Sequence, residues 1–284
     1  MRCVLVVLKA ALATEGGKNA AFASGKFVPL LNRIWPIAID LEFNDPAAPG
    51  LGAAGGEPSL LSLLLGTIQN YVYGSIEAKK SLDASTRSPA TPLTSRIVNL
   101  SLRQGLPGYL VSGSFGVLKS LALPPSPSRG PLSTSSLYPT LIKQLTASLR
   151  PKNQPSANPR YSASRTPHFL GGLSLLVNAT LDGAGRQAVF SSWNVLSPLV
   201  SDLTSLRLPT CVCDALLGLL RNVSLSSFRA SLLEPSLLSW VVSRLSGPSH
   251  RAAISTVWIM LFKSEKCVSL VKRDRELMAR ILQG

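Results

Sequence analysis

The segment LLVNAT at residues 175–180 recurs as LLRNVS at 219–224, and this repetition is the strongest indication of the fold. Related segments are RIVNLS at 96–101 and, less fully, TIQNYV at 67–72, so that an apolar run ends four times in asparagine: Asn70, Asn99, Asn178 and Asn222. Asn178 and Asn222 are 44 residues apart (222 − 178). A period of roughly 40–47 residues is typical of stacked helical repeats.

A second pattern is an apolar stripe with the spacing i, i+3, i+4, i+7, which is typical of an amphipathic helix. The complete stripes are Phe27, Leu30, Leu31, Ile34; Leu196, Leu199, Val200, Leu203; and Leu238, Val241, Val242, Leu245, and a weaker one is Ser114, Val117, Leu118, Leu121. Each stripe follows a break of small residues or proline, at 24–25, 191–192, 234–235 and 112–113. No run alternates as a half-buried strand does. We therefore expect an all-α solenoid in which neighbouring repeats bury each other's apolar faces.

The repeated asparagines have two possible roles. A short amide can bond the backbone of a tight turn after the helix, which is the role that we favour. The alternative is glycosylation, because Asn99, Asn178 and Asn222 each begin an N-x-[ST] sequon. Their position at the end of apolar helical runs argues against it, since a glycan there would displace packing.

The repeats and the loops divide the chain into five segments. We expect a helical repeat at 1–43, a loop at 44–58, helical repeats at 59–123, a flexible basic insertion around one short helix at 124–168, and helical repeats at 169–284. The repeat after Asn70 appears truncated, because Asn99 follows after only 29 residues (99 − 70). The insertion is rich in proline and serine, a composition that favours flexible chain.

Charge and cysteine content limit the environment of the protein. The 284 residues carry 29 Lys and Arg against 14 Asp and Glu, a net charge of +15, and no acidic residue occurs from Ala84 to Leu181. Four scattered cysteines do not form the framework of a small secreted domain, so we expect a reducing compartment. Lys9 interrupts the apolar start early for a signal peptide. No apolar run reaches the roughly 18 residues of a membrane span, so we expect a soluble protein with no membrane partner.

The asparagine motif, the basic turn after it, the small-residue break and the stripe together resemble armadillo repeats. The segment AAISTVWIMLF at 252–262 resembles the third helix of such a repeat, with Trp258 at the position of the tryptophan that this helix carries. More particularly, the order of segments 30–36, 96–101, 117–123, 175–178 and 219–281 is similar to the carboxyl-terminal region of the rotatin family. These are long armadillo-like proteins of centrioles and ciliary basal bodies, and the resemblance covers most of the chain except 44–58 and 124–168.

Chemical sites are hard to find in this sequence. His168 and His250 belong to no recognisable triad, so we expect no catalytic, cofactor-binding or metal-binding residues. Cys211, Cys213, Cys267 and His250 lack the paired spacing of a zinc site, and we expect buried thiols instead. Asp40, Glu42, Asp45 and Glu57 flank a loop, where we expect them to be solvated. Core packing is the favoured role of Trp35, Trp193, Trp240 and Trp258.

The leading functional hypothesis is a non-enzymatic scaffold, without a cofactor or small-molecule substrate. The resemblance implies action in centriole and basal-body assembly and in ciliogenesis, through protein partners, with a location in the cytoplasm and cytoskeleton at the centriole or basal body. The alternative is an adaptor whose basic face binds nucleic acid or an acidic protein, although we expect any nucleic-acid binding to be weak and non-specific. The binding residues stay unknown, and Asn70, Asn99, Asn178, Asn222 and Trp258 are structural repeat positions.

Overall fold

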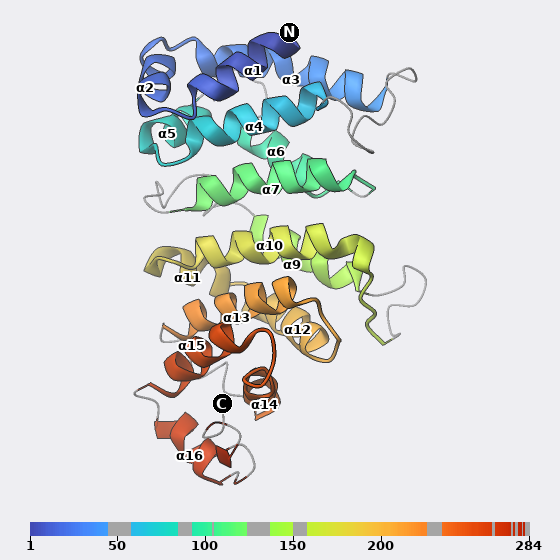
Figure 1. Cartoon of the computed structure of the whole chain (residues 1–284), viewed down its shortest axis with the longest axis vertical. Coiled ribbons are helices and arrows are strands. Elements are labelled where there is room, and N and C mark those ends of the chain that lie inside the picture. Colours follow the sequence, from blue (N-terminus) through green and yellow to red (C-terminus); the bar gives the residue numbers. More distant parts are fainter. Residues whose placement is uncertain are drawn as a thin grey trace. The chain divides into compact units, whose positions relative to one another are not determined.

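Every regular element that the structure describes is a helix (Figure 1). The structure is a computed structural model that describes residues 1–44, 58–84, 93–103, 105–123, 137–149, 158–225, 235–262 and 265–273, with 275, 278, 279 and 281 beyond them. The predicted all-α fold is therefore confirmed for these residues. The chain divides into two compact units, Met1–Ser135 and Ser136–Gly284, which are described in turn.

Unit 1 is built around a stack of three helices in which α4 packs against α1 on one side and α7 on the other (Figure 1). A second helix, α3, packs on α4, and α6 packs on α7. The elements are α1 (Arg2–Ala11), α2 (Glu15–Ala23), α3 (Phe27–Phe43), α4 (Leu60–Val72), α5 (Ile76–Ala84), α6 (Leu93–Ser101) and α7 (Gly108–Ala122). The central place of α4 explains why nine of its residues are buried.

Side-chain caps fix where several of these helices begin. Thr14 accepts a hydrogen bond from the backbone N–H of Gly17 at the start of α2, and Ser59 accepts one from Ser62 at the start of α4. Each cap satisfies a backbone donor that has no partner inside its own helix. The turn between α2 and α3 contains Gly25 at φ 61°, a left-handed conformation that glycine adopts without strain.

Most residues of the predicted stripes form the cores of the two units. All four residues of the stripes that begin at Ser114, Leu196 and Leu238 are buried, as are Phe27, Leu31 and Ile34 of the first stripe. Leu30 is the exception, because 39% of its surface stays exposed on α3. The amphipathic pattern therefore identifies the buried face correctly, except at the edge of α3.

The short spacing between Asn70 and Asn99, which suggested a truncated repeat, arises because the two residues lie on helices with different places in unit 1. Asn99 lies on α6, which has nine residues, and the next helix stacked on α4 is α7. The predicted break at residues 112–113 lies inside α7 instead of before it. The 29-residue spacing therefore does not mark a lost helix, because Asn99 does not occupy the place in the stack that Asn70 has.

Unit 2 contains two rows of helices. One row is α10, α13 and α15, with α13 packed against both neighbours, and the other is α9, α12 and α14, with α12 between its neighbours. The elements are α9 (Leu137–Ser148), the short 3-10 helix η2 (Ala163–Arg165), α10 (Thr166–Ala179), α11 (Gly183–Phe190), α12 (Trp193–Thr204), α13 (Thr210–Ser224), α14 (Pro235–Ser243), α15 (His250–Leu261) and α16 (Glu265–Arg273). This arrangement is consistent with a helical solenoid.

The predicted flexible insertion at 124–168 needs correction, because its short helix belongs to the core of unit 2. Helix α9 packs on α10 and α12, and its apolar residues Tyr138, Leu141, Ile142 and Leu145 are all buried. Helix α10 also begins at Thr166, inside the predicted insertion. The remaining parts of that prediction, 124–136 and 150–157, lie outside the described residues, as do 45–57 of the predicted loop.

Candidate functional site

Two of the repeated asparagines connect successive helices of a stack. Asn70 of α4 donates from Nδ2 to the carbonyl of Lys9 on α1, at 2.8 Å. Asn222 of α13, only 3% exposed, donates to the carbonyl of Val177 on α10 at 3.0 Å and lies 3.3 Å from Thr180 Oγ1. The prediction that these amides serve the turn after their own helix is therefore wrong, because their partners lie on the preceding helix of the stack.

The other two asparagines differ from this pair. Asn99 is exposed on α6, whereas Asn178 is half-buried on α10. The burial argument against glycosylation therefore holds for Asn222 but does not apply to Asn99. Threonine supplies a comparable link in α15, where Thr256 Oγ1 donates to the carbonyl of Leu217 on α13 at 3.1 Å.

The turn that follows α1 in unit 1 and the turn that follows α10 in unit 2 have the same local design, and each is called a corner below. Each helix ends in alanine, Ala11 or Ala179, and a capping residue follows three positions later, Thr14 or Asp182. A glycine follows three positions after the capping residue and faces the carbonyl of the helix's final alanine. A Cβ atom added to this glycine would lie 2.1 Å from the carbonyl oxygen at Gly17 and 1.6 Å from it at Gly185. The carbonyl that accepts the asparagine lies two residues before each final alanine.

A basic residue follows three of the repeated asparagines, at Lys79, Arg186 and Arg229, and two of these side chains bond carbonyls at helix ends. Arg186 donates from Nη1 to the carbonyls of Thr180 and Leu181, at 3.1 Å each, just after α10. Lys79 is 2% exposed and donates from Nζ to the carbonyl of Leu123 at the end of α7, at 2.5 Å. Burial lowers the pKa of Lys79. A cation is favourable at a helix C-terminus, so these residues stabilise the fold. Arg229 lies outside the described residues.

A glycine lies four residues before each linking asparagine and faces the preceding helix of the stack. These are Gly66 before Asn70 and Gly218 before Asn222. A Cβ atom at Gly66 would lie 2.9 Å from Lys9 Cε, and one at Gly218 would lie 3.5 Å from Val177. The repeated G-x-x-x-N spacing is present in the sequence and could have identified this contact before the structure was known.

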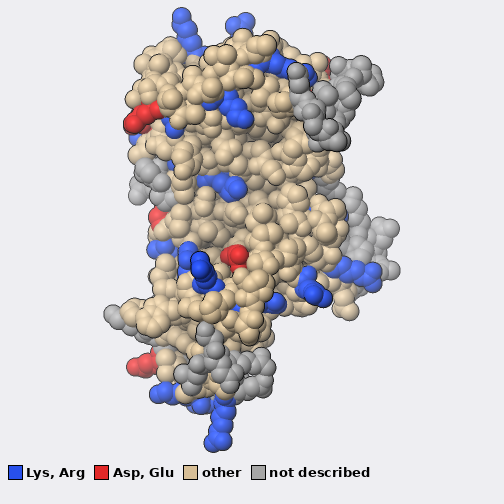
Figure 2. Space-filling model, in the orientation of Figure 1, with Lys and Arg blue, Asp and Glu red and all other residues tan. Residues whose placement is uncertain are grey.

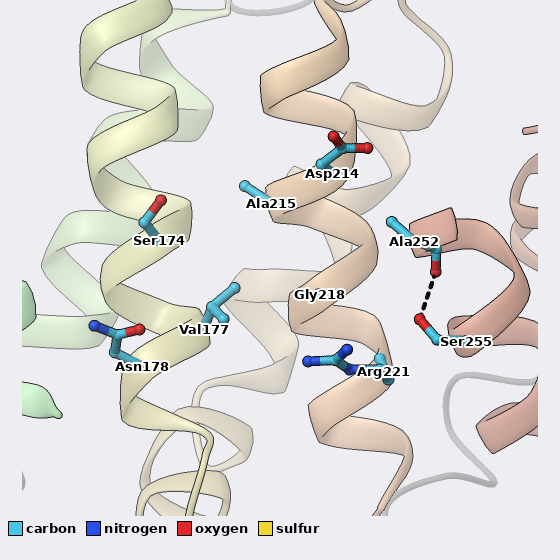
Figure 3. Close-up of a pocket in the computed structure, with 9 residues that line it drawn as sticks. All are labelled: Ser174, Val177, Asn178, Asp214, Ala215, Gly218, Arg221, Ala252 and Ser255. Atoms are coloured by element: carbon cyan, nitrogen blue, oxygen red, sulfur yellow. Dashed lines mark hydrogen bonds between the residues drawn. The ribbon is translucent and has the colours of Figure 1, made fainter. Parts of the chain in front are cut away.

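A pocket of about 310 Å³ opens over the row α10, α13 and α15 (Figure 3). Figure 3 shows Val177 pointing from α10 toward α13, while the guanidinium of Arg221 extends from α13 toward α10. Gly218 has no side chain to fill the space between them. The lining residues are Ser174, Val177, Asn178, Asp214, Ala215, Gly218, Arg221, Ala252 and Ser255.

The chemistry of this pocket suits recognition of a polar chain segment. Asp214 and Arg221 are seven residues apart on α13, so two helical turns place an anion and a cation on one face. Ser174 and Asn178 on α10 add a hydroxyl and an amide. Small residues leave the floor open, and the polar groups can fix the orientation of a bound segment.

Several of the titratable groups singled out in the sequence lie among the residues that the structure describes. Burial, and then the charge of Arg165, lower the pKa of His168, so this imidazole is neutral near pH 7. His250 Nδ1 lies 2.7 Å from the carbonyl of Leu245 in the turn before α15. Burial raises the pKa of Cys213, which disfavours its thiolate. Glu42 is expected from the sequence to be solvated, but in the structure its Oε1 accepts a hydrogen bond from the hydroxyl of Tyr109.

The thiols follow the sequence prediction only in part. Cys213 is buried, whereas Cys3 and Cys211 are exposed, and the side chain of Cys267 lies outside the described residues. Within the part of the chain that the structure describes, no three His, Cys, Asp or Glu side chains are grouped closely enough to hold a metal ion. Asp40 accepts a hydrogen bond from Asn44, and Asp45 and Glu57 lie outside that part.

The tryptophans also divide into two groups. Trp35 and Trp240 are buried, and Trp193 is half-buried and stacks on Phe190. Trp258 is 66% exposed on α15, so the prediction that it packs in the core is wrong. Its ring stacks on Phe262, with the ring centres 6.2 Å apart. An exposed aromatic pair on the outer side of α15 is a surface that sequence periodicity did not identify.

Comparison with known proteins gives no family for this chain. No protein-family model matches the sequence, and no curated protein is significantly similar to it. In the described helices, none combines the length and the apolar content that a bilayer crossing requires.

Proposed function

We propose that this protein is a non-enzymatic scaffold of helical repeats that acts through protein–protein contacts in centriole and ciliary basal-body assembly. The cellular role comes from the resemblance to the rotatin family. The observation that supports a binding scaffold is the pocket over α10, α13 and α15, because three successive helices contribute small and polar residues to one open surface. The partner's segment would lie across the row, between Asp214 and Arg221.

Support for a repeat scaffold also comes from the shared corner after α1 and α10. Both corners present a backbone carbonyl to an asparagine of the next helix in the stack. Such nearest-neighbour links are what an array of stacked helices needs, since each repeat gains its stability from the adjacent repeats. An array of this kind presents extended surfaces for partners.

The test is the location of the fluorescently tagged full chain in ciliated cells. We expect it to coincide with a centriole marker, and we expect a variant with Asp214→Arg and Arg221→Glu to become diffuse. The control is Arg251→Glu, which reverses a cation on α15 that lies outside the pocket. A diffuse wild-type chain would contradict the cellular role, and an unchanged pocket variant would contradict the role of the pocket.

A second function, binding of nucleic acid or an acidic protein by a basic face, is favoured by the net charge of +15. In the face shown in Figure 2, however, the Lys and Arg side chains are distributed among uncharged residues and do not form a single patch. A distributed positive charge supports diffuse attraction to polyanions and gives no basis for reading a base sequence.

A further inference from the structure

The pocket over α10, α13 and α15 contains two opposite charges that come from one helix. Asp214 and Arg221 are seven residues apart on α13, a spacing that places them on the same side of the helix and about 10 Å apart along its axis. In Figure 3, Asp214 lies above Gly218 and Arg221 lies below it. The pocket therefore has a negative end and a positive end, and the residue between them has no side chain.

Neither charge is neutralised within the part of the chain that the structure describes. No described residue forms an ion pair with Asp214 or Arg221, and the guanidinium of Arg221 lies 3.5 Å from the neutral amide oxygen of Asn222. The other residues that line the pocket are uncharged. A ligand with charges of one sign only would meet a like charge at one end of the pocket, which disfavours its binding. The pocket therefore favours a ligand that carries both charges.

The size of the pocket favours an extended segment over a helix. A volume of about 310 Å³ corresponds to a width of about 7 Å if the space is equally wide in every direction, whereas a helix with its side chains is about 10–12 Å across. An extended chain is narrower, since paired strands lie about 5 Å apart, and its successive side chains point to opposite sides. A segment that crosses α13 at Gly218 therefore directs one side chain toward Asp214 and the next toward Arg221.

We infer that the pocket selects an extended segment of a partner protein in which a basic residue, Lys or Arg, stands next to an acidic residue, Asp or Glu. The basic side chain pairs with Asp214 and the acidic side chain pairs with Arg221, while the backbone of the segment passes over Gly218. Ser174 on α10 and Ser255 on α15 supply polar groups on the two sides of α13. This inference rests on the proposed function of the pocket as a binding site, and it names the chemistry of the segment that the pocket takes.

The test measures the binding of labelled synthetic peptides to the full chain by fluorescence anisotropy at near-physiological salt. Four peptides of equal length share the same flanks of Ala and Ser and differ in their central pair, which is Lys-Asp, Lys-Lys, Asp-Asp or Ala-Ala. We expect the Lys-Asp peptide to bind at least tenfold more tightly than each of the other three. Equal or tighter binding of the Asp-Asp peptide would overturn the inference, because the net positive charge of the chain would then be enough to explain the attraction.

Two single variants test the two ends of the pocket separately. Arg221→Glu should weaken binding of the Lys-Asp peptide at least tenfold and make the Lys-Lys peptide the tightest ligand. Asp214→Lys should weaken it by the same factor and make the Asp-Asp peptide the tightest ligand. The matched control is Lys143→Glu on α9, which changes the net charge as Arg221→Glu does but lies outside the pocket, and which should leave all four affinities unchanged. A change of preference cannot come from misfolding, which would weaken every peptide.

The outcomes separate this inference from the proposed cellular role. Selective binding of the Lys-Asp peptide by a chain that is diffuse in cells would support the inference and contradict the centriolar role. A chain that is found at centrioles but binds all four peptides equally, or none of them, would overturn the inference alone. So would an equal loss of binding with Lys143→Glu and Arg221→Glu. Tighter binding of a peptide whose Lys and Asp are three residues apart would also overturn it, because the segment would then lie along α13 instead of across it.

Discussion

Asn99 and Asn222 show how one sequence motif gives two structural roles. Each follows an apolar run and begins an Asn-x-Ser triplet. Of the two, Asn222 is the one that is buried and hydrogen-bonded to a neighbouring helix. The difference arises because α13 stacks directly on α10, whereas α6 stands beside α7 and presents Asn99 to solvent. Tertiary position therefore decides what the amide does.

Replacing Asn222 with Leu should lower the free energy of unfolding by about 1–3 kcal/mol, because the carbonyl of Val177 and the hydroxyl of Thr180 lose a buried donor. Urea unfolding followed by circular dichroism measures the change. The matched control is Asn99→Leu, which removes an exposed amide and should change stability by no more than about 0.5 kcal/mol. Equal effects of the two substitutions would contradict the assigned role of Asn222.

Exposed residues such as Trp258 and Leu30 mark the limit of what the sequence could predict. Periodicity shows which side of a helix is apolar, but it does not show whether another helix covers every part of that side. Trp258 belongs to an apolar helix and is nevertheless 66% exposed. The candidate pocket was equally inaccessible to prediction, since it depends on how α10, α13 and α15 are placed relative to one another.

At the scale of the elements, the corner between α10 and α11 depends on the absence of a side chain at one position. Gly185 follows the cap Asp182 and faces the carbonyl of Ala179, which is backbone and cannot move aside as a side chain can. The sequence contains this spacing twice, at Ala11 to Gly17 and at Ala179 to Gly185. The glycine contact was predictable in principle from that repetition.

Gly185→Ala should therefore destabilise the chain by about 2 kcal/mol, because the added methyl group forces the first turn of α11 away from α10. Gly183→Ala in the same turn should be neutral or stabilising by about 0.5 kcal/mol, since its Cβ would meet only the end of Arg186 at 3.9 Å. Thermal unfolding of both variants checks the expectation. A destabilising Gly183→Ala with a harmless Gly185→Ala would refute it.

Helix α9 was the element whose role the sequence concealed. Its apolar residues were recognised as one short helix, but the surrounding proline and serine suggested that the whole segment was an insertion. Composition describes the connections on each side, whereas burial depends on the neighbours α10 and α12. A short helix inside low-complexity sequence can therefore be core, and its packing could not be deduced from composition.

Ile142→Ala should lower the free energy of unfolding by about 2–5 kcal/mol, because Ile142 is fully buried in α9. Lys143→Ala changes the adjacent, exposed position and should stay within about 0.5 kcal/mol of the wild type. Urea unfolding of the full chain distinguishes the two. If α9 were part of a flexible insertion, Ile142→Ala would be as harmless as Lys143→Ala.

For the whole molecule, the dominant property is the net charge of +15, and on the face shown in Figure 2 the Lys and Arg side chains are scattered among uncharged residues. Such a charge attracts any polyanion, and the attraction weakens as salt screens it. Deleting residues 124–168 would not isolate the contribution of the basic surface, because it would also remove α9, which packs on α10 and α12. Salt is therefore the better variable for testing the basic surface.

Binding to duplex DNA should be weak, independent of base sequence, and lost between low and near-physiological salt, because it rests on the release of counterions from phosphates. Titration of the intact chain with two unrelated duplexes at both salt concentrations measures this. A specific acidic protein partner should retain more of its affinity, since apolar contacts share the interface. Tight, salt-resistant binding that prefers one duplex would favour the nucleic-acid adaptor over the scaffold.

The division of the chain into two units has a consequence for protein synthesis. The helices that build the core of unit 1 all lie within Met1–Ser135. At roughly 5–20 residues per second, translation of the rest of the chain takes roughly 7–30 s, far longer than a helical stack of this size needs to form. Unit 1 can therefore fold on the ribosome before α13 of unit 2 has been synthesised.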